Sequence, residues 1–338
     1  MNLLVITQKP NGASFRQRIE VYLPLLQERG CRCEVAVLPA GTWDRRRLFR
    51  QARAFDAVLL HRKTVGFWDG RWLRGASAKV LYDFDDAVMY RDAEPDRPSG
   101  HRTQRFRRTA GVADLVIAGN AYLAEHAHRF NPHVEVLPTG LDTEAYAKRA
   151  DREKDGLVRL VWIGSHSTLK YLEQIGPVLE ELGRRLPNVV LRIICDEFFE
   201  LQHMRVEKRQ WSLEREVADL VTSDIALAPL PDDRFTRGKC GFKILQCAAA
   251  GLPVVASPVG ANAEYVRDGV TGFHATDAAT WRRVLDALVA DPGKRTSMGQ
   301  AGRLEVRKFD LAVVGERFCE VISACVRSGN QGRAGTGL

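Results

Sequence analysis

The sequence has no run of apolar residues near the roughly 20 that a helix needs to span a bilayer. Its first residues, MNLLVITQKPNG, contain no basic segment followed by an apolar segment of the kind found in secretory signal peptides. The seven cysteines are scattered, odd in number and without a Cys-x-x-Cys pair, so that neither a disulfide framework nor a zinc site is predicted. We therefore expect a cytoplasmic protein with reduced thiols.

Motifs for nucleic-acid binding are also missing. The net charge is +8, and arginines gather in two places, Arg45–Arg50 and Arg102–Arg108. Basic clusters attract phosphate-rich partners, which include nucleic acid, anionic lipid and nucleotide ligands. Because no helix-turn-helix, zinc or ribonucleoprotein motif accompanies these clusters, nucleic acid is not expected as a partner.

What the chain does contain is a regular alternation of short apolar runs with helix-like, charged segments. This alternation predicts parallel sheets covered by helices on both faces. A length of 338 residues accommodates two such domains. The hydrophobic pattern lapses over 148–156, which we interpret as the linker. The expected strands are 3–7, 33–38, 57–61, 80–83, 114–118 and 134–137 before the linker, and 158–163, 189–195, a strand around 206, 225–230 and 252–256 after it.

Three longer helices are predicted. One is a long helix that begins near Ser14, and another runs from the turn after Ile163 to about Arg185. The third, 310–327, is amphipathic, and its residues on or near one face are Val313, Val314, Phe318, Val321 and Ile322. The polar, glycine-rich tail beyond Ser328 is expected to be disordered.

The stretch 238–266, GKCGFKILQCAAAGLPVVASPVGANAEYV, concentrates the functional signals. Lys239 and Lys243 lie near the start of a predicted helix, where free backbone N–H groups and the helix dipole favour an anion. Gly251 stands where the end of that helix requires a left-handed residue. A phosphate site is therefore one interpretation, and two ordinary solvated lysines are the other.

Polar residues also follow other predicted strands. Arg16 and Arg18 lie close to the Pro-Asn-Gly turn after the first strand, and they either reach a phosphate or carboxylate or are surface arginines. Because the turn is not a GxGxxG fingerprint, no dinucleotide is indicated. Asp85 and Asp86 follow the strand 80–83, where they either contribute to a site that binds a sugar, a lysine or a metal, or cap a helix.

Three stretches together resemble the family 4 glycosyltransferases of the GT-B fold: the block 238–266, the turn WIGSHST at 162–168, and the connection 120–146. The resemblance covers nearly the whole chain. It implies two Rossmann-like domains that face each other across a cleft. Residues 1–148 would form the acceptor domain and 149–308 the donor domain, with the helix 309–328 packing back on the N-terminal domain and a disordered tail at 329–338.

The activity implied by this resemblance is transfer of a sugar from a nucleotide sugar, with retention of configuration, to a glycan, a lipid-linked or a small-molecule acceptor. Such enzymes typically need no metal and no further cofactor. The expected mechanism is front-face displacement, in which the leaving diphosphate helps to deprotonate the attacking hydroxyl. No enzyme nucleophile is needed, which agrees with the lack of a carboxylate pair of the hydrolytic kind.

The resemblance also assigns roles to residues. Lys239 and Lys243 would neutralise the donor diphosphate. Stabilising the negative charge on the leaving group is expected to be the largest contribution to catalysis. Family members commonly carry two glutamates eight positions apart, and here Gly238 and Gln246 replace them. Gln246 can still bind a ribose hydroxyl. The expected donor-binding residues are Gly12, Gly164, Ser165, Asp232, Lys239, Gln246, Gly260, Asn262 and Glu264.

The missing first glutamate leaves the sugar-facing carboxylate to be supplied by Asp232 or Asp233. Asp85 stands where some relatives carry a histidine, and it is expected to contact the donor sugar or the acceptor. The expected catalytic residues are Asp85, Asp233 and Lys243, and the expected acceptor contacts are Arg16 and Arg18.

Other functions stay open at this stage. A nucleotide-sugar epimerase would need clustered histidine and carboxylate groups, which the sequence does not suggest. A non-catalytic nucleotide-sugar-binding protein is favoured by the missing glutamate. A membrane-surface protein would use the arginine clusters on anionic lipid. Peripheral association at the inner face of the membrane is also compatible with transfer to a lipid-linked acceptor.

Overall fold

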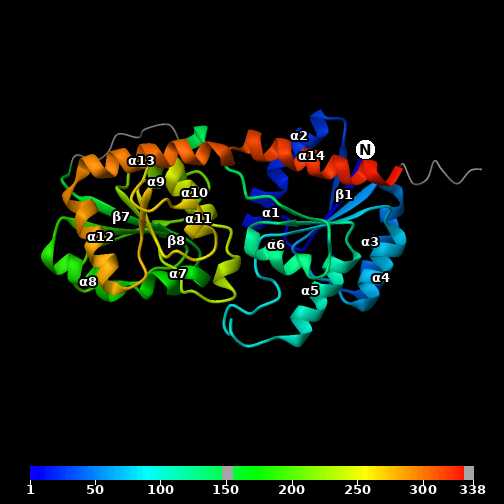
Figure 1. The fold of residues 1–338 in the computed structure, drawn as a ribbon, viewed down its shortest axis with the longest axis horizontal. Helices are drawn as coiled ribbons and strands as arrows, with labels where there is room; N and C mark the ends of the chain where they lie inside the picture. The colour runs from blue at the N-terminus through cyan, green and yellow to red at the C-terminus, as the bar shows by residue number, and fades with distance from the viewer. Residues whose placement is uncertain (147–154, 331–338) are drawn as a thin grey trace, which may run out of the picture. The chain divides into compact units, whose positions relative to one another are not determined.

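A computed structural model describes residues 1–146 and 155–330 of the chain. It divides the chain into two compact units (Figure 1). The first unit comprises Met1–Gly140, Asp233–Cys240 and the chain from Leu311 onward, and the second comprises Leu141–Asp232 and Gly241–Asp310. The second unit begins at Leu141, earlier than the predicted boundary between 148 and 149. Most of the predicted linker lies outside the described residues. Of the tail 329–338 that was predicted to be disordered, residues 329 and 330 belong to the C-terminal helix Leu311–Asn330, and 331–338 lie outside the described residues.

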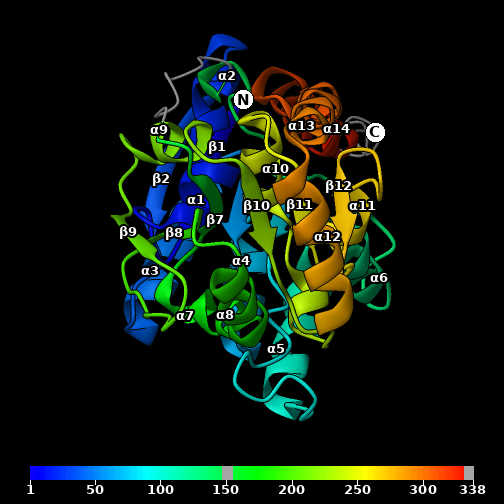
Figure 2. The same cartoon turned by 90° about the vertical axis from the view of Figure 1, so that its left-hand side faces the viewer.

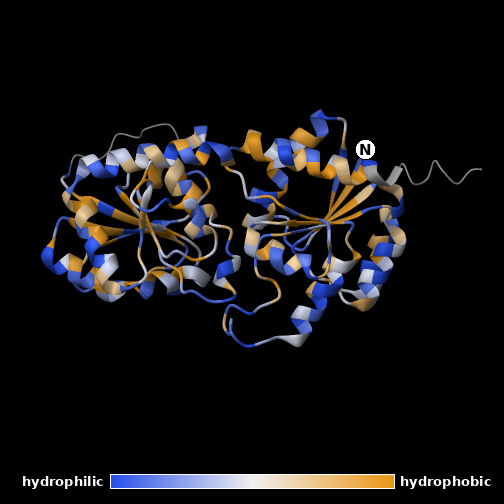
Figure 3. Cartoon of the chain, in the orientation of Figure 1, coloured by the Kyte–Doolittle hydropathy of each residue, from blue (hydrophilic) through white to orange (hydrophobic). Residues whose placement is uncertain are grey.

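The first unit contains a parallel sheet of six strands in the order β2-β1-β3-β4-β5-β6. Every residue of β3 and β4 is buried, as a parallel sheet with helices on both faces requires. The apolar strands form the orange centre of the unit in Figure 3. The strands are β1 Asn2–Thr7, β2 Arg32–Val37, β3 Ala57–His61, β4 Val80–Phe84, β5 Leu115–Ala118 and β6 Val134–Val136.

Helices cover both faces of this sheet. One face packs against α3 Thr42–Gln51, α4 Phe67–Ala76, α5 Gly100–Val112 and α6 Ala121–His128, and the other against α1 Ala13–Arg18, α2 Leu23–Glu28 and α14 Leu311–Asn330. The prediction of one long helix from Ser14 is wrong. The segment forms α1, a short 3-10 helix at Glu20–Tyr22, and α2, which restarts at Pro24 because proline suits the first turn of a helix and disrupts its interior.

The C-terminal helix α14 belongs to the first unit and contacts α2. Of the five apolar residues predicted on or near one face, it buries Val314, Phe318, Val321 and Ile322, whereas Val313 is 54% exposed. The Phe318 ring lies 5.0 Å from that of Tyr22. Among the residues that the structure describes, no helix combines the length and the apolar character needed to cross a membrane.

The second unit has a parallel sheet in the order β12-β11-β10-β7-β8-β9. The helices α7, α8 and α12 cover one face and α9, α10 and α13 the other (Figure 2). The strands are β7 Val158–Ile163, β8 Val189–Cys195, β9 Val206–Gln210, β10 Ile225–Ala228, β11 Val254–Ala256 and β12 Gly272–His274. The helices are α7 His166–Glu173, α8 Gly176–Arg185, α9 Glu216–Val221, α10 Phe242–Ala249, α11 Ala261–Tyr265, α12 Ala278–Ala290 and α13 Pro292–Val306.

The single helix predicted up to Arg185 is in fact two, because Pro177 starts α8 after a break at Gln174–Ile175. The glycine signal after α10 is confirmed, since Gly251 has φ +74°. Two all-parallel sheets, each covered on both faces, confirm the predicted α/β fold class with two Rossmann-like domains.

Each sheet has one point at which the strand order reverses. In the first unit this is between β1 and β3, and in the second between β7 and β10. The connections leave these neighbouring strands toward opposite faces, which opens a crevice at the carboxyl ends of the strands. Ligands of open α/β sheets bind in such crevices. The topology therefore predicts one candidate site in each unit.

Candidate functional site

The crevice of the first unit is a pocket of about 570 Å³. Two loops form most of its wall, 7–15 after β1 and 61–64 after β3. Asp86, Val88, Arg102 and Phe235 complete it. The pocket therefore lies at the reversal point of the strand order, where the topology predicts a ligand.

A chain of hydrogen bonds runs along the wall of this pocket. Ser14 Oγ donates to Asp85 Oδ2 at 2.6 Å and lies 3.1 Å from His61 Nε2. Since the serine proton is directed to Asp85, Nε2 carries the imidazole proton and donates to Ser14. The other ring nitrogen, Nδ1, then accepts from the Thr7 hydroxyl, 3.1 Å away. The hydrogen-bond pattern thereby fixes the tautomer of His61.

The charges of this network are set by burial and by neighbouring arginines. Burial lowers the pKa of His61 to about 4, so the imidazole is neutral at physiological pH. Burial opposes ionisation of Asp85, but Arg62, Arg18, His61 and the Ser14 hydrogen bond together lower its pKa. Asp85 is therefore an ionised carboxylate. Its Oδ1 is buried and has no hydrogen-bond partner among the described residues.

Asp85 does not itself line the pocket. Ser14, His61 and Asp86 form the wall next to it. Ser14, which does line the pocket, donates to Asp85 Oδ2. The contact of Asp85 with a donor sugar or an acceptor stays a prediction.

Asp86 bridges two cations. Arg62 pairs with its Oδ2, and Lys239 Nζ lies 3.2 Å from its Oδ1. Burial raises the pKa of Asp86 although both cations oppose this. Arg62 has φ +61°, a left-handed conformation that non-glycine residues rarely adopt and that often marks a functional site. Within the described parts of the chain, no three His, Cys, Asp or Glu side chains are grouped as metal ligands.

Arg18 has a structural role, and its prediction as an acceptor contact is wrong. Its side chain is 3% exposed and forms a bidentate pair with Asp83, which is 1% exposed. It also donates to the carbonyl of Leu137 at 2.9 Å. The Arg18 guanidinium therefore faces the protein interior and is not accessible to an acceptor. Arg16 is half-buried and lies outside the set of residues that line the pocket.

The neutral state of His61 predicts a pH dependence of stability. The folded-state pKa of about 4 lies below the ordinary value of 6.5, so the stabilisation is present above pH 6.5 and is lost as the pH falls through 4. A shift of this size corresponds to about 3 kcal/mol. The variant His61→Gln keeps hydrogen-bonding groups but does not titrate. We expect urea denaturation between pH 7 and pH 4 to show a steeper loss for the wild type than for H61Q, and equal slopes would contradict a neutral buried His61.

At the reversal point of the second sheet, the turn after β7 lies against the start of α10. Lys243 is the second residue of α10, and its Nζ lies 3.0 Å from Thr168 Oγ1 and 4.8 Å from the centre of the Trp162 ring. A side chain at Gly164 would meet the Trp162 ring at 2.1 Å and Lys243 Nζ at 2.7 Å. Glycine is therefore required for the lysine to approach the turn. Within the turn, the Ser165 backbone N–H donates to Thr168 Oγ1 at 3.3 Å, and the hydroxyl oxygens of Ser165 and Ser167 lie 3.0 Å apart.

His166, in the same turn, faces a carboxylate. Its Nδ1 lies 3.1 Å from Asp196 Oδ2, and its backbone N–H donates to Asp196 Oδ1 at 2.9 Å. Hydrogen bonds from Cys195 and His166 lower the pKa of Asp196 to about 2. The His166 backbone N–H, in the first turn of α7, is thus already hydrogen-bonded to the Asp196 carboxylate.

The block 238–266 does not form one unit. Gly238–Cys240 belongs to the first unit, and the chain from Gly241 onward belongs to the second. The prediction that both lysines stand at the start of one helix is wrong, because Lys239 follows the short 3-10 helix Thr236–Gly238 and pairs with Asp86. Gly241, with φ +64°, separates it from α10.

Two further predicted residues have other partners in the structure. Gln246 is buried, and its Nε2 donates to Tyr146 Oη at 3.0 Å, which is not the ribose contact that was predicted. Asp233 Oδ1 accepts the backbone N–H groups of Phe235 and Thr236, both at 2.8 Å. These bonds fix the turn that leads into the 3-10 helix Thr236–Gly238 in the first unit, and the catalytic role predicted for Asp233 is not supported by this geometry.

The remaining predicted donor residues are dispersed. Asp232 lines a pocket of about 360 Å³ at the carboxyl ends of β10 and β11 in the second unit. Gly260 has φ +53° before α11, Asn262 is buried and donates to the carbonyl of Ala228, and Glu264 is exposed. Gly12 lies in the first unit and lines its pocket.

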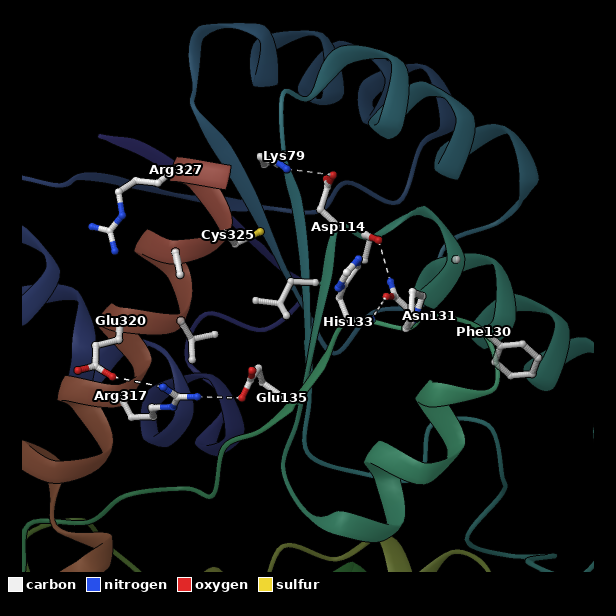
Figure 4. A pocket seen from close by; sticks show the side chains of 16 residues that line it. Lys79, Asp114, Phe130, Asn131, His133, Glu135, Arg317, Glu320, Cys325 and Arg327 are labelled. Atoms are coloured by element: carbon white, nitrogen blue, oxygen red, sulfur yellow. Dashed lines mark hydrogen bonds and ion pairs between the residues drawn. The ribbon is translucent and has the colours of Figure 1, made fainter. Parts of the chain in front are cut away.

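A larger pocket of about 920 Å³ lies between α14 and the amino ends of the neighbouring strands (Figure 4). Apart from Arg327, its charged side chains pair with one another. Lys79 Nζ lies 3.6 Å from Asp114, and Arg317 lies 3.0 Å from Glu135 and 3.3 Å from Glu320. It opens at the edge of the sheet opposite to the carboxyl ends, where ligands of this architecture do not bind.

Among the residues of the first pocket that sequence reasoning did not assign to a site are Ser14, His61 and Arg62. His61 is the last residue of a correctly predicted strand. The rule that ligand sites lie at the carboxyl ends of parallel strands, which indicated Asp85, therefore applied to His61 as well. For Arg62 no local signal predicts the left-handed backbone.

Comparison with known proteins gives a family and several relatives. Residues 143–291 match the family described as Glycosyl transferases group 1. The chain is 27% identical to a D-inositol 3-phosphate glycosyltransferase of Nocardia farcinica, over 96% of this chain and 82% of that protein. It is 28% identical to a GDP-mannose-dependent alpha-(1-6)-phosphatidylinositol monomannoside mannosyltransferase of Mycolicibacterium smegmatis, over 64% of this chain and 64% of that protein.

Solved structures share the fold. The Anabaena protein HepE in complex with UDP and glucose aligns with a TM-score of 0.74 at 16% identity, covering 96% of this chain and all of that one. A sucrose-phosphate synthase from Thermosynechococcus elongatus aligns with a TM-score of 0.75 at 14% identity, covering 97% of this chain and all of that one.

Proposed function

We propose that the chain is a glycosyltransferase of the GT-B fold and that it transfers a hexose from a nucleotide sugar to a hydroxyl group of an acceptor; the matched family, the curated relatives and the shared fold support this. The donor is consumed as a co-substrate, and no cofactor takes part in this scheme. The observation that carries the proposal is the placement of Lys243 against the Gly164 turn, at the reversal point of the second sheet.

The chemistry of the second-unit crevice suits a departing diphosphate. When the bond between the sugar and the diphosphate breaks, negative charge develops on the leaving oxygens. A fixed ammonium group stabilises that charge most when it does not have to move into place. Thr168 and the Trp162 ring hold the Lys243 ammonium group in advance of the reaction.

The first-unit pocket suits an acceptor with an acidic group. Lys9, Arg62, Lys63 and Arg102 line it, against one carboxylate, that of Asp86. Burial first, and then Arg105, Arg45 and Arg102, lower the pKa of Lys63, which reports a positive local field. The acceptors in the names of the two curated relatives, an inositol phosphate and a phosphatidylinositol mannoside, carry phosphate and support this choice.

For the reaction we propose retention of configuration by front-face displacement, with the leaving diphosphate taking up the acceptor proton. Ser14 would accept the hydrogen bond of the attacking hydroxyl. The ionised Asp85 would keep the serine oxygen oriented, and the neutral His61 would hold it from the other side. These roles need no covalent enzyme intermediate.

A second candidate is a nucleotide-sugar-binding protein without activity. The observation that favours it is the packing of Gly238, which stands at the place of the first family glutamate. A side chain at this position would meet the Ala87 Cβ at 2.7 Å and the Ala87 backbone nitrogen at 3.0 Å. The fold therefore has no room for a glutamate there.

A panel of UDP-, GDP-, ADP- and dTDP-sugars separates the two candidates. Transfer of sugar to a phosphorylated polyol, or slow donor hydrolysis, supports the transferase. Thermal stabilisation by one nucleoside diphosphate without turnover supports the binding protein, and no stabilisation by any of them rejects both. In the transferase case, Asp85→Asn is expected to lower kcat while stabilisation by the nucleoside diphosphate is unchanged, since Asp85 belongs to the first unit.

A further inference from the structure

The first unit exposes an unusual number of large aromatic side chains on two neighbouring helices. Trp43 on α3 is 73% exposed, and Phe67 and Trp68 on α4 are 56% and 60% exposed. Large aromatic side chains are normally buried, and an exposed cluster of them marks an interaction site.

These side chains form one continuous surface. The Arg46 guanidinium lies 5.6 Å from the centre of the Trp43 ring and 5.5 Å from that of Trp72. The Trp72 ring stacks at 6.4 Å on Trp68, whose ring lies 5.2 Å from Phe67. Arg108 of α5 lies 5.8 Å from the Phe67 ring. We call Trp43, Phe67, Trp68 and Trp72, with Arg46 and Arg108, the aromatic face.

The helices that carry the aromatic face are strongly basic. Together α3, α4 and α5 contain ten arginines and two aspartates, a surplus of eight that equals the net charge of the whole chain. One of the two aspartates, Asp69, is already paired with Arg45. The basic character of the protein is thus concentrated around its exposed aromatic residues.

We propose that the aromatic face docks the protein on an anionic lipid bilayer. Tryptophan rings partition to the boundary between headgroups and acyl chains, because one side of the ring is apolar and the indole N–H is polar. Arginines beside them reach anionic headgroups, and their stems cover apolar surface. Exposed tryptophans surrounded by an excess of positive charge match this interface on both counts.

The aromatic face lies at the same edge of the first sheet as the first-unit pocket. Trp43, Phe67 and Trp68 lie in the first turns of α3 and α4, which follow the carboxyl ends of β2 and β3. The first-unit pocket, which we propose binds the acceptor, opens at this edge, and Lys63 and Arg102 belong to its wall. A lipid-linked acceptor would therefore present its headgroup beside the pocket. This last step rests on the proposed function, whereas the docking itself does not.

Flotation of the full-length protein with vesicles tests the proposal. We expect binding to vesicles of phosphatidylcholine mixed with phosphatidylglycerol, weakened by salt, and little binding to phosphatidylcholine alone. The double variant Trp43→Ser, Trp68→Ser should lose most of the binding. Arg47→Glu with Arg50→Glu should weaken it by at least about tenfold, since each arginine near an anionic surface contributes about 1 kcal/mol.

Matched variants in the second unit control for bulk effects. Arg184→Glu with Arg283→Glu changes the net charge by the same amount, and Leu213→Ser with Leu304→Ser removes two exposed apolar side chains. Both are expected to bind vesicles like the wild type. The proposal is overturned if anionic vesicles do not bind, if the control pairs lose as much binding, or if the tryptophan variant changes only self-association. Stabilisation by a nucleoside diphosphate, measured in parallel, reports separately on the proposed function.

Discussion

Replacing Lys243 with alanine is expected to lower kcat/KM for sugar transfer by roughly a hundredfold to a thousandfold, the range for loss of one preorganised group that stabilises developing negative charge. The lysine is held at 3.0 Å from Thr168 and over the Trp162 ring, so the wild-type ammonium group needs no rearrangement. The variant should also lose most of the thermal stabilisation by the nucleoside diphosphate, because that ligand carries the charge in the ground state. Steady-state kinetics and thermal denaturation with the ligand measure the two effects.

Lys239 provides the matched control for this experiment. It lies four residues earlier in the same sequence block, but its ammonium group belongs to the first unit and pairs with Asp86. Lys239→Ala should leave stabilisation by the nucleoside diphosphate close to that of the wild type. If it abolishes that stabilisation as completely as Lys243→Ala does, the two lysines share one anion and the assignment to Lys243 alone is wrong.

The fold was predictable because its signals are local. Strands such as β3 and β7 are apolar except for His61 and Arg159, and every residue in them is buried. Their alternation with helix-like segments requires parallel sheets. Two predicted helices continued past Pro24 and Pro177, where the structure starts a new helix. The apolar pattern runs across both prolines, and hydrophobic periodicity does not show that proline lacks the backbone N–H that a helix interior needs.

The site was less predictable because its partners are distant in the sequence. Ser14 meets His61 and Asp85 across separations of 47 and 71 residues, and no local spacing encodes these contacts. The block 238–266 was read as one motif, but the fold divides it between two units at Gly241. The amide of Gln246 was expected to bind a ribose, yet its helical position turns it inward between the buried residues Leu245 and Cys247.

The second prediction with a large expected effect concerns folding stability and rests on the buried ion pair of Arg18 and Asp83. Arg18→Met is expected to destabilise the first unit by about 3–5 kcal/mol, because it leaves a buried carboxylate without its partner. Burial already raises the pKa of Asp83 to about 6 even with Arg18 present. The variant should therefore regain stability relative to the wild type as the pH falls, since protonation removes the uncompensated charge. Urea denaturation at pH 7 and pH 5 measures both the loss and its recovery.

Two further variants separate loss of the charge pair from loss of packing. Arg29→Met breaks the exposed pair with Glu316 in the same unit and should change little, because exposed pairs are solvated in both states. The double variant Arg18→Met, Asp83→Leu removes both buried charges and should recover much of the stability lost in Arg18→Met. If the double variant is no more stable than the single one, the hydrogen bond from Arg18 to the Leu137 carbonyl and the packing of its side chain, not the unpaired carboxylate, account for the loss.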